Sequence, residues 1–350
     1  MKRTLFASCL VLSALGSAAF AAPGFFLEPK TTFGGGDGVL APGDRTYLAN
    51  DNNQRGLAFN ATNNHVYVVS RTGGLSVNII DGITGADVGS LSTAGITQGT
   101  FVLNAIGVGA DGAIYAANLS TNTASATQPL KIYRWANESA TPTVAFTGAP
   151  TGATGARFGD NLDVRGSGAN TQILLGGNSG AGTGSITYNS YAVFTTANGT
   201  DFTGQGMTLT GPANGSHRLG VAFGPGNTAY GKQTGAGNLE YSTFDLSGTA
   251  TRNAGAPFTL TTANETALDV DALNTLLATV EINTSAVRLY DISNPTVSPV
   301  LLDTETLIAT SNPNANGSGA LAFGNGMLYV GSGAGSLPGN VLLAFSAEGS

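Results

Sequence analysis

The stretch Gly56-Leu-Ala-Phe-Asn-Ala-Thr-Asn-Asn-His-Val-Tyr-Val-Val69 contains two short apolar runs separated by a polar turn. The same arrangement returns in Ala320-Leu-Ala-Phe-Gly-Asn-Gly-Met-Leu-Tyr-Val330, where Asn325-Gly326 is a hairpin-turn pair. Short apolar runs bounded by Asn, Asp and Gly are typical of antiparallel strand pairs. This pair of strands is therefore the unit from which the fold is built.

The unit occurs six times, at steps of 48 to 58 residues, when the sequence is aligned on Ala58, Val108, Val164, Ala222, Val270 and Ala322. A third strand follows in each unit, and five units add a fourth strand. We expect this fourth strand at Met207–Leu209 in the third unit and at Pro257–Leu260 in the fourth unit. Four-stranded units of about 50 residues are the signature of propeller blades. The sequence predicts an all-β fold, a six-bladed β-propeller with antiparallel blades; seven blades is the alternative.

The predicted propeller spans residues 51–350, and we place its blades near 55–93, 104–148, 157–211, 217–262, 265–309 and 317–347. The sixth unit ends after three strands. We expect the N-terminal segment 22–50 to supply the missing outer strand, from either Phe25–Leu27 or Thr46–Leu48. The termini would then close the last blade and leave no bare sheet edge at the seam.

Residues 1–21 are predicted to be a cleaved signal peptide. Lys2 and Arg3 precede the apolar run Leu5–Phe20, and Ala19-Phe-Ala21 is a small-residue cleavage site. Cleavage removes Cys9, the single cysteine, so the mature chain would have neither disulfides nor thiolate chemistry. We expect a protein that is secreted, periplasmic or on the cell surface.

The composition excludes several classes of protein. The whole chain has 350 residues, a formal net charge of −7 and 10% charged residues. Without residues 1–21, 12 Lys and Arg remain against 21 Asp and Glu, a net charge of −9. Such a chain repels phosphate backbones, so no nucleic-acid partner is expected. We also expect no membrane span in the mature chain, and a monomer.

Several passages carry a family resemblance. They include Asn53-Gln-Arg-Gly-Leu-Ala-Phe-Asn60, Asp81-Gly-Ile-Thr-Gly-Ala-Asp87 and Lys131-Ile-Tyr-Arg-Trp-Ala-Asn-Glu138. They resemble an uncharacterised family of secreted bacterial β-propellers and are distantly similar to the YVTN and NHL propellers. The resemblance implies the fold and secretion. It brings no catalytic residues with it.

Polar residues recur where the chain enters each inner strand and where it leaves each second strand, and these loops build one face of a propeller. We predict that this face binds a ligand through Arg55, Arg71, Asn104, Asn118, Arg157, Asp160, Asn178, His217, Arg218, Lys232, Glu265, Glu281 and Asn316. The alternative is that these residues cap strand ends and pair with one another.

Two features of the sequence suggest chemistry. Asp160, Glu265 and Glu281 are candidate oxygen ligands for a hard cation such as Ca²⁺, and His217 is a candidate general base. Asp269 and Asp271 alternate on one strand, where close carboxylates can raise a pKa or hold a cation. Alternatively one of them caps a turn or pairs with Arg288.

These observations favour an exported binding or scaffolding module over an enzyme. Its ligand would be extracellular or in the cell envelope, a glycan or a protein, with no cofactor except a Ca²⁺ ion in the alternative reading. That alternative is a metal-assisted hydrolase or lyase on the same face. A purely structural envelope protein is the third reading.

Overall fold

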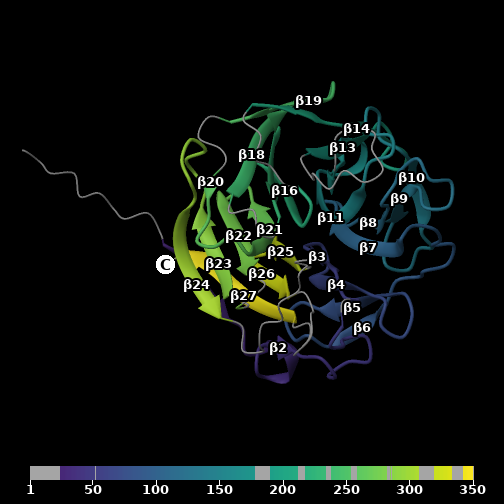
Figure 1. The fold of residues 1–350 in the computed structure, drawn as a ribbon. Coiled ribbons are helices and arrows are strands. Elements are labelled where there is room, and N and C mark those ends of the chain that lie inside the picture. The colour runs from purple at the N-terminus through teal and green to yellow at the C-terminus, as the bar shows by residue number, and fades with distance from the viewer. Residues whose placement is uncertain are drawn as a thin grey trace, which may run out of the picture.

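The computed structural model describes residues 24–51, 53–177, 190–211, 217–233, 238–253, 258–281, 284, 286–306, 319–332 and 342–349. The predicted signal peptide lies outside these ranges. The described chain forms six sheets arranged as blades around a common centre (Figure 1). The prediction of a six-bladed propeller is confirmed, and the seven-bladed alternative is wrong.

The first three blades each contain four antiparallel strands in sequence order from the channel outward. They are β3 (Gly56–Asn60), β4 (His65–Ser70), β5 (Ser76–Asp81) and β6 (Asp87–Ser90); β7 (Phe101–Val108), β8 (Ile114–Leu119), β9 (Leu130–Trp135) and β10 (Thr143–Gly148); and β11 (Phe158–Arg165), β12 (Gln172–Gly177), β13 (Ser190–Thr196) and β14 (Phe202–Gly206).

Blades four to six follow the same order, with additions at their edges. They are β16 (Gly220–Gly224), β17 (Thr228–Lys232), β18 (Asn238–Phe244) and β19 (Thr249–Arg252), with β15 (Thr208–Thr210) and β20 (Phe258–Thr259) attached; β21 (Glu265–Asp271), β22 (Leu276–Glu281), β23 (Ala286–Asp291) and β24 (Val300–Thr306); and β25 (Ala320–Gly324), β26 (Met327–Gly331), β27 (Leu342–Gly349) and β1 (Phe25–Pro29), with β2 (Val39–Leu40) attached to β27.

The inner strands form a closed ring. Contacts join β3 to β7, β7 to β11, β11 to β16, β16 to β21, β21 to β25, and β25 back to β3. Apolar side chains fill the spaces between neighbouring blades, as where Tyr115 and Ala105 of blade two meet Leu162 and Leu175 of blade three. The hydrophobic core is therefore divided into wedges between blades.

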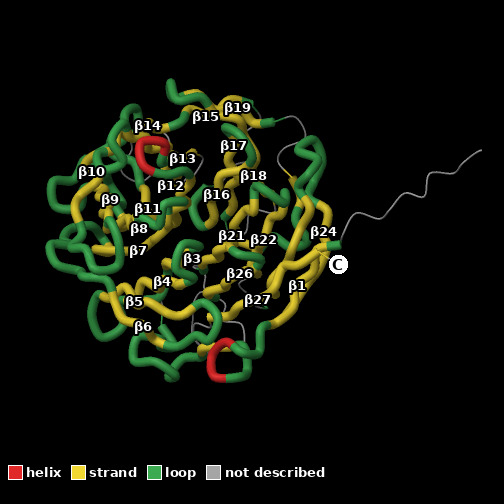
Figure 2. The backbone as a smooth tube through the Cα atoms, turned by 180° about the vertical axis from the view of Figure 1, so that it is seen from behind, coloured by secondary structure: helices red, strands yellow, loops and turns green. Residues whose placement is uncertain are grey.

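The N-terminal strand closes the last blade. β1 pairs antiparallel with β27, with Leu27 opposite Ala347 and Pro29 opposite Phe345 (Figure 2). Of the two predicted candidates for the closing strand, the one at Phe25–Leu27 is confirmed. Residues Thr46–Leu48 form a turn, and Leu48 packs in the core beside Phe33 and Leu40.

Two predicted outer strands are corrected. The outer strand of blade three is β14. The predicted segment Met207–Leu209 overlaps β15 (Thr208–Thr210), which crosses to blade four and pairs in parallel with β19. In blade four the outer strand is β19 rather than the segment near Leu260, where β20 pairs with the beginning of β18. These segments are short and have a similar apolar content. The sequence therefore does not specify which neighbouring strand each of them pairs with.

Strand register also corrects the alignment of the repeats. Ala58, Gly107, Ala222 and Ala322 each lie opposite a fully or almost fully buried tyrosine of the second strand, namely Tyr67, Tyr115, Tyr230 and Tyr329. In blades three and five the same position is held by Asp163 and Asp269, opposite Leu174 and Ala278. The alignment on Val108, Val164 and Val270 was therefore shifted by one residue.

Helical structure is scarce. In the described ranges it consists of two 3₁₀ turns, η1 (Phe33–Gly35) and η2 (Gly168–Asn170). Neither is long or apolar enough to cross a membrane.

Candidate functional site

Most of the predicted face residues are linked by contacts that pass from blade to blade. The Arg71 guanidinium donates to the side-chain oxygen of Asn104, 3.2 Å away, and the Asn104 amide donates to the Gly159 and Asp160 carbonyls. Further round the ring, Lys232 donates a 3.0 Å hydrogen bond to the carbonyl of Ala263, just before β21. The fold therefore brings Arg71, Asn104 and Asp160 together. Asn178 and Asn316 lie outside the described residues.

Asn118 has a local role. Its amide donates to the carbonyls of Gln98 and Pro129, and its oxygen accepts the N–H of Lys131. The side chain is buried and joins the segment before β7 and the beginning of β9 to β8.

Three arginines surround one carboxylate at the mouth of the channel. Arg157 forms a two-pronged pair with Asp160, at 2.6 and 2.7 Å, and Arg218 approaches the same carboxylate at 3.4 Å. Burial lowers the pKa of Arg55, while the Asp160 charge raises it and the charges of Arg218 and Arg157 lower it. Arg55 and Asp160 both line the channel cavity.

A second pair of arginine contacts extends this group toward blade one. The guanidiniums of Arg71 and Arg55 lie over the ring of Phe101, at 4.1 and 5.4 Å from its centre. Burial lowers the pKa of Arg71 to about 10, and the neighbouring Arg55 charge acts in the same direction. Asp51 is the acidic residue on this side, and its charge raises the pKa of Arg71.

This part of the face has a surplus of positive charge. The positive charges of Arg55, Arg71, Arg157 and Arg218 outnumber the negative charges of their acidic neighbours Asp51 and Asp160 by four to two. By sequence, the segments 178–189, 212–216, 234–237, 254–257, 307–318 and 333–341 contain no charged residue and so add no side-chain charge. The whole chain has a net charge of −7, so this group of arginines forms a positively charged region on a negatively charged protein. It is here called the arginine cluster.

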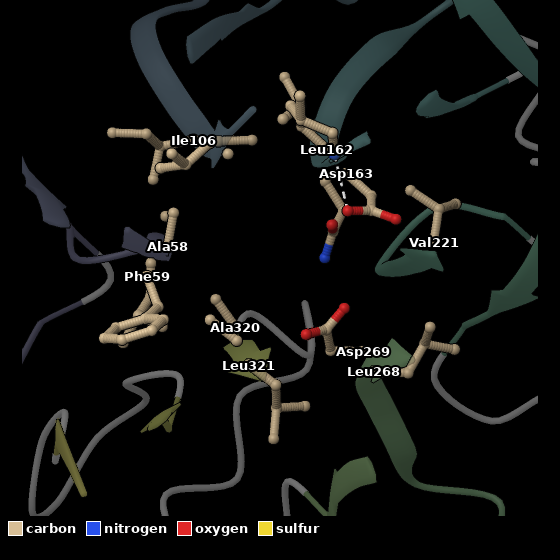
Figure 3. A pocket seen from close by; sticks show the side chains of 18 of the residues that line it. Ala58, Phe59, Ile106, Leu162, Asp163, Val221, Leu268, Asp269, Ala320 and Leu321 are labelled. Carbon is tan, nitrogen blue, oxygen red and sulfur yellow. Dashed lines mark hydrogen bonds between the residues drawn. The ribbon is translucent and has the colours of Figure 1, made fainter. Parts of the chain in front are cut away.

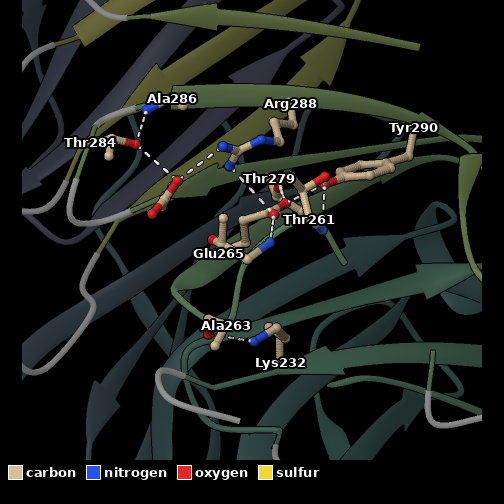
Figure 4. Close-up of polar contacts among 11 residues, drawn as sticks. Lys232, Thr261, Ala263, Glu265, Thr279, Thr284, Ala286, Arg288 and Tyr290 are labelled. Atoms are coloured by element: carbon tan, nitrogen blue, oxygen red, sulfur yellow. Dashed lines mark hydrogen bonds and ion pairs between the residues drawn. The ribbon is translucent and has the colours of Figure 1, made fainter. Parts of the chain in front are cut away.

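The acidic residues of blade five form a separate polar network (Figure 4). Glu265 accepts hydrogen bonds from Thr262 N, Thr279 and Tyr290, at 2.7, 2.5 and 2.7 Å. Arg288 lies between the two glutamates, 3.4 Å from Glu265 and 3.0 Å from Glu281. Burial lowers the pKa of Lys232 to about 8, and the Glu265 charge opposes that shift. This network stabilises the junction of blades four and five.

The three predicted metal ligands do not gather around one point. Asp160 is paired with Arg157, and Glu265 and Glu281 are paired with Arg288. Among the described residues no group of three His, Cys, Asp or Glu side chains could hold a metal ion. The geometry gives the calcium interpretation no support.

His217 is enclosed between blades three and four. Its side chain is fully buried, its ring lies 5.1 Å from that of Tyr191, and neither ring nitrogen has a hydrogen-bond partner. Burial lowers the pKa of His217 to about 3, and the Arg252 charge adds to the effect. A histidine that stays neutral and does not reach the solvent is poorly suited to act as a general base.

Two channel residues were missed as part of the site. Asp163 and Asp269 line a central cavity of about 110 Å³, and their carboxyl groups point into the space between the inner strands (Figure 3). The sequence had shown Asp269 only as half of a pair with Asp271, which instead caps a turn through the N–H groups of Leu273 and Asn274. A repeat alignment shifted by one residue would have revealed both carboxylates at one position.

Each of these carboxylates holds the next blade. Asp163 accepts the N–H of Phe223 at 2.6 Å, and Asp269 accepts the N–H of Phe323 at 2.7 Å. Burial raises the pKa of Asp163 to about 6. Burial and then the charge of Asp163 raise the pKa of Asp269 to about 8. Both residues keep some accessible surface, and both line the cavity.

Comparison with known proteins supports the fold. Residues 47–206 match the model of a domain of unknown function, DUF4623. None of the curated proteins matches the chain. A crystal structure of a DUF4623 family protein from Bacteroides eggerthii is 16% identical, with a TM-score of 0.54 over 85% of this chain and 72% of that one.

Other similar structures have names that refer to enzymes or to calcium. A putative gluconolactonase is 13% identical, with a TM-score of 0.55 over 92% of this chain and 98% of that one. Regucalcin from Agrobacterium tumefaciens, described as a calcium-binding protein, is 15% identical, with a TM-score of 0.50 over 85% and 92%. At these identities the likeness shows the fold alone. The match over residues 47–206 and the Bacteroides structure together confirm the predicted resemblance to an uncharacterised β-propeller family.

Proposed function

We propose that this protein is an exported binding module that takes an anionic ligand at the arginine cluster. The observation that carries the proposal is the arrangement of Arg55, Arg157 and Arg218 around the single carboxylate of Asp160. Three guanidinium charges therefore face one carboxylate charge. The site therefore attracts a further negative charge.

The chemistry of arginine narrows the ligand class. Guanidinium groups bind carboxylates and other oxyanions through paired N–H donors, and they hold these anions more tightly when partly removed from water. The side chains of Arg157 and Arg218 are 19% and 15% exposed, so they are accessible from solvent but largely surrounded by protein. A ligand with a carboxylate, such as an acidic glycan or an acidic peptide segment, fits this environment.

The compartment is part of the proposal. The signal-peptide pattern of residues 1–21 and the low content of charged residues support export, and the ligand is then extracellular or in the envelope. The separate network around Glu265, Arg288 and Glu281 supports a structural role for blade five instead of metal-assisted catalysis.

Calorimetric titration with an acidic oligosaccharide tests the proposal. Oligogalacturonate is the probe, and an uncharged malto-oligosaccharide of equal length is its control. We expect binding of the acidic probe alone, weakened at least tenfold by Arg218→Gln and by raised salt. Arg45→Gln is the matched control variant, because Arg45 is also ion-paired and partly exposed but contacts Asp87 instead.

The titration has clear opposing outcomes. Equal binding of both sugars would refute the charge argument. So would an Arg218→Gln variant that has the melting temperature of the wild type and binds the acidic probe with the same affinity. If neither sugar binds, an acidic peptide of alternating Glu and Gly is the second probe. Failure of both acidic probes would overturn the proposed anionic ligand.

A further inference from the structure

The inner strands contain two carboxyl groups that the arginine cluster does not use. Asp163 and Asp269 hold the same position in the ring as Ala58, Gly107, Ala222 and Ala322. A small residue fills that position in four blades. The two aspartates are therefore a departure from the repeat, and a stable ring of inner strands does not require them.

The two carboxyl groups face the same cavity. Both line the cavity of about 110 Å³, beside apolar side chains of the inner strands such as Ile106, Val221 and Leu321 (Figure 3). Two carboxylates in such a cavity lose hydration and repel each other. The neutral form of at least one of them is thereby favoured.

Each carboxyl group is also a link between blades. Asp163 on β11 accepts the N–H of Phe223 on β16, and Asp269 on β21 accepts the N–H of Phe323 on β25. The links are equivalent, since each runs from a blade to the residue after the small residue of the next blade. A change of charge on either carboxyl group therefore acts on the contact between two inner strands.

We propose that Asp163 and Asp269 form a proton-binding pair that controls how tightly the inner ring is held, with one proton kept in the channel at neutral pH. Loss of that proton to solvent leaves two carboxylates in the same cavity. Their repulsion then loosens the contacts of β11 with β16 and of β21 with β25. The proposal is independent of the anionic ligand at the arginine cluster.

The charged groups around the pair do not cancel this effect. Arg55, just before β3, lines the cavity. Strand β11 carries Asp160, which is paired with Arg157, and Arg165. Strand β21 carries Asp271. By sequence, strands β7, β16 and β25 contain no titratable residue. The Arg165 charge lowers the pKa of Asp163, while the charges of Asp163 and Asp271 raise that of Asp269. Both effects favour the proton on Asp269 over Asp163.

The sign of the pH effect follows from the raised pKa values. A folded state that binds more protons than the unfolded chain loses stability as the pH rises. For Asp269 this window runs from its ordinary pKa of 3.8 to about 8. Within it, one retained proton changes the unfolding equilibrium constant about tenfold per pH unit.

Urea unfolding from pH 5 to pH 9 tests the pair. Relative to Asp269→Asn, the wild-type unfolding constant should rise by up to about tenfold per pH unit up to pH 8. Asp271→Asn is the control two residues away. Its side-chain oxygen can still accept the turn N–H groups of Leu273 and Asn274, and the variant should keep most of the wild-type slope because Asp271 is the smallest of the influences that raise the pKa of Asp269. A wild-type slope equal to that of Asp269→Asn would overturn the proposal.

Infrared spectroscopy detects the protonated carboxyl group directly, so its signal would not change if Asp269 only stabilised the fold. The wild type should show a protonated carboxyl band at pH 7 that is lost in Asp269→Asn, and its absence from the wild type would refute the pair. Asparagine keeps an oxygen that can accept the Phe323 N–H. If Asp269→Asn does not fold, Asp269→Ala replaces it, because alanine is the residue of blades one, four and six at this position.

Discussion

The backbone N–H of Leu27 donates a 2.8 Å hydrogen bond to the carboxylate of Asp303, 276 residues further along the chain. Leu27 lies on the strand that completes blade six, and Asp303 lies on the outer strand of blade five. The N-terminal segment thus joins its own blade by strand pairing and the neighbouring blade by a side-chain acceptor. The seam of the ring is fastened at two places.

Loss of the buried contact at the seam should destabilise the protein. Leu27 is 3% exposed and packs with Phe345 and Leu289, so Leu27→Ala should cost about 2–4 kcal/mol in urea unfolding. Phe26→Ala is the control on the same strand, because Phe26 is 39% exposed and should cost less than about 1 kcal/mol. Equal losses of stability in the two variants would mean that the buried side chain of Leu27 does not stabilise the seam.

Removal of the central carboxylate should weaken the arginine cluster. Asp160→Ala leaves the guanidiniums of Arg157 and Arg218 without their shared partner. Because both arginines keep some exposure, water moderates the cost, and we expect about 2 kcal/mol in urea unfolding. Asp160→Asn, which keeps the shape, should lose a similar amount. Full stability of the asparagine variant would show that shape, and not charge, matters here.

The close approach of Gly231 to His217 should appear in a double-mutant cycle. A Cβ at Gly231 would lie 2.1 Å from Cδ2 of His217, so Gly231→Ala should be strongly destabilising, by about 3 kcal/mol. His217→Ala removes the ring. Combined with Gly231→Ala it should cost less than the sum of the two single changes. Additive losses would contradict the contact.

His217 should make the fold sensitive to acid. Its pKa of about 3 lies below the ordinary value of 6.5, so the folded state binds fewer protons than the unfolded chain between these values. Stability is therefore present above pH 6.5 and lost as the pH falls. His217→Phe should remain more nearly constant than the wild type in urea unfolding at pH 7, 5 and 4. Parallel curves for the two proteins would refute the prediction.

The repeated strand pairs allowed the architecture to be predicted, because alternating apolar residues and Gly/Asn/Asp turns act locally. The candidate site was predicted less completely. Residues at the beginnings of inner strands, such as Arg55 and Asp160, could be assigned to one face from topology alone. Which of them pair could not be predicted, since Asp160 lies three residues from Arg157 but 58 from Arg218, and only the ring brings that second arginine close.

The outer strands of blades three and four show a second limit. Short segments such as Thr208–Thr210 have a similar preference for either of two sheets, and packing against β19 decides between them. The same holds for Asp163 and Asp269, whose positions in the repeat became clear only from strand register.

By itself the sequence indicated six blades and an N-terminal segment that closes the ring, because hydrophobic periodicity and turn chemistry depend on residues close together in the chain. The structure decided that Phe25–Leu27, and not Thr46–Leu48, is the closing strand. The tertiary structure decided which charges meet: three arginines at the channel mouth and two carboxyl groups within it. Electrostatic interactions depend on distance and on exclusion of water, and both are set only when distant segments pack together.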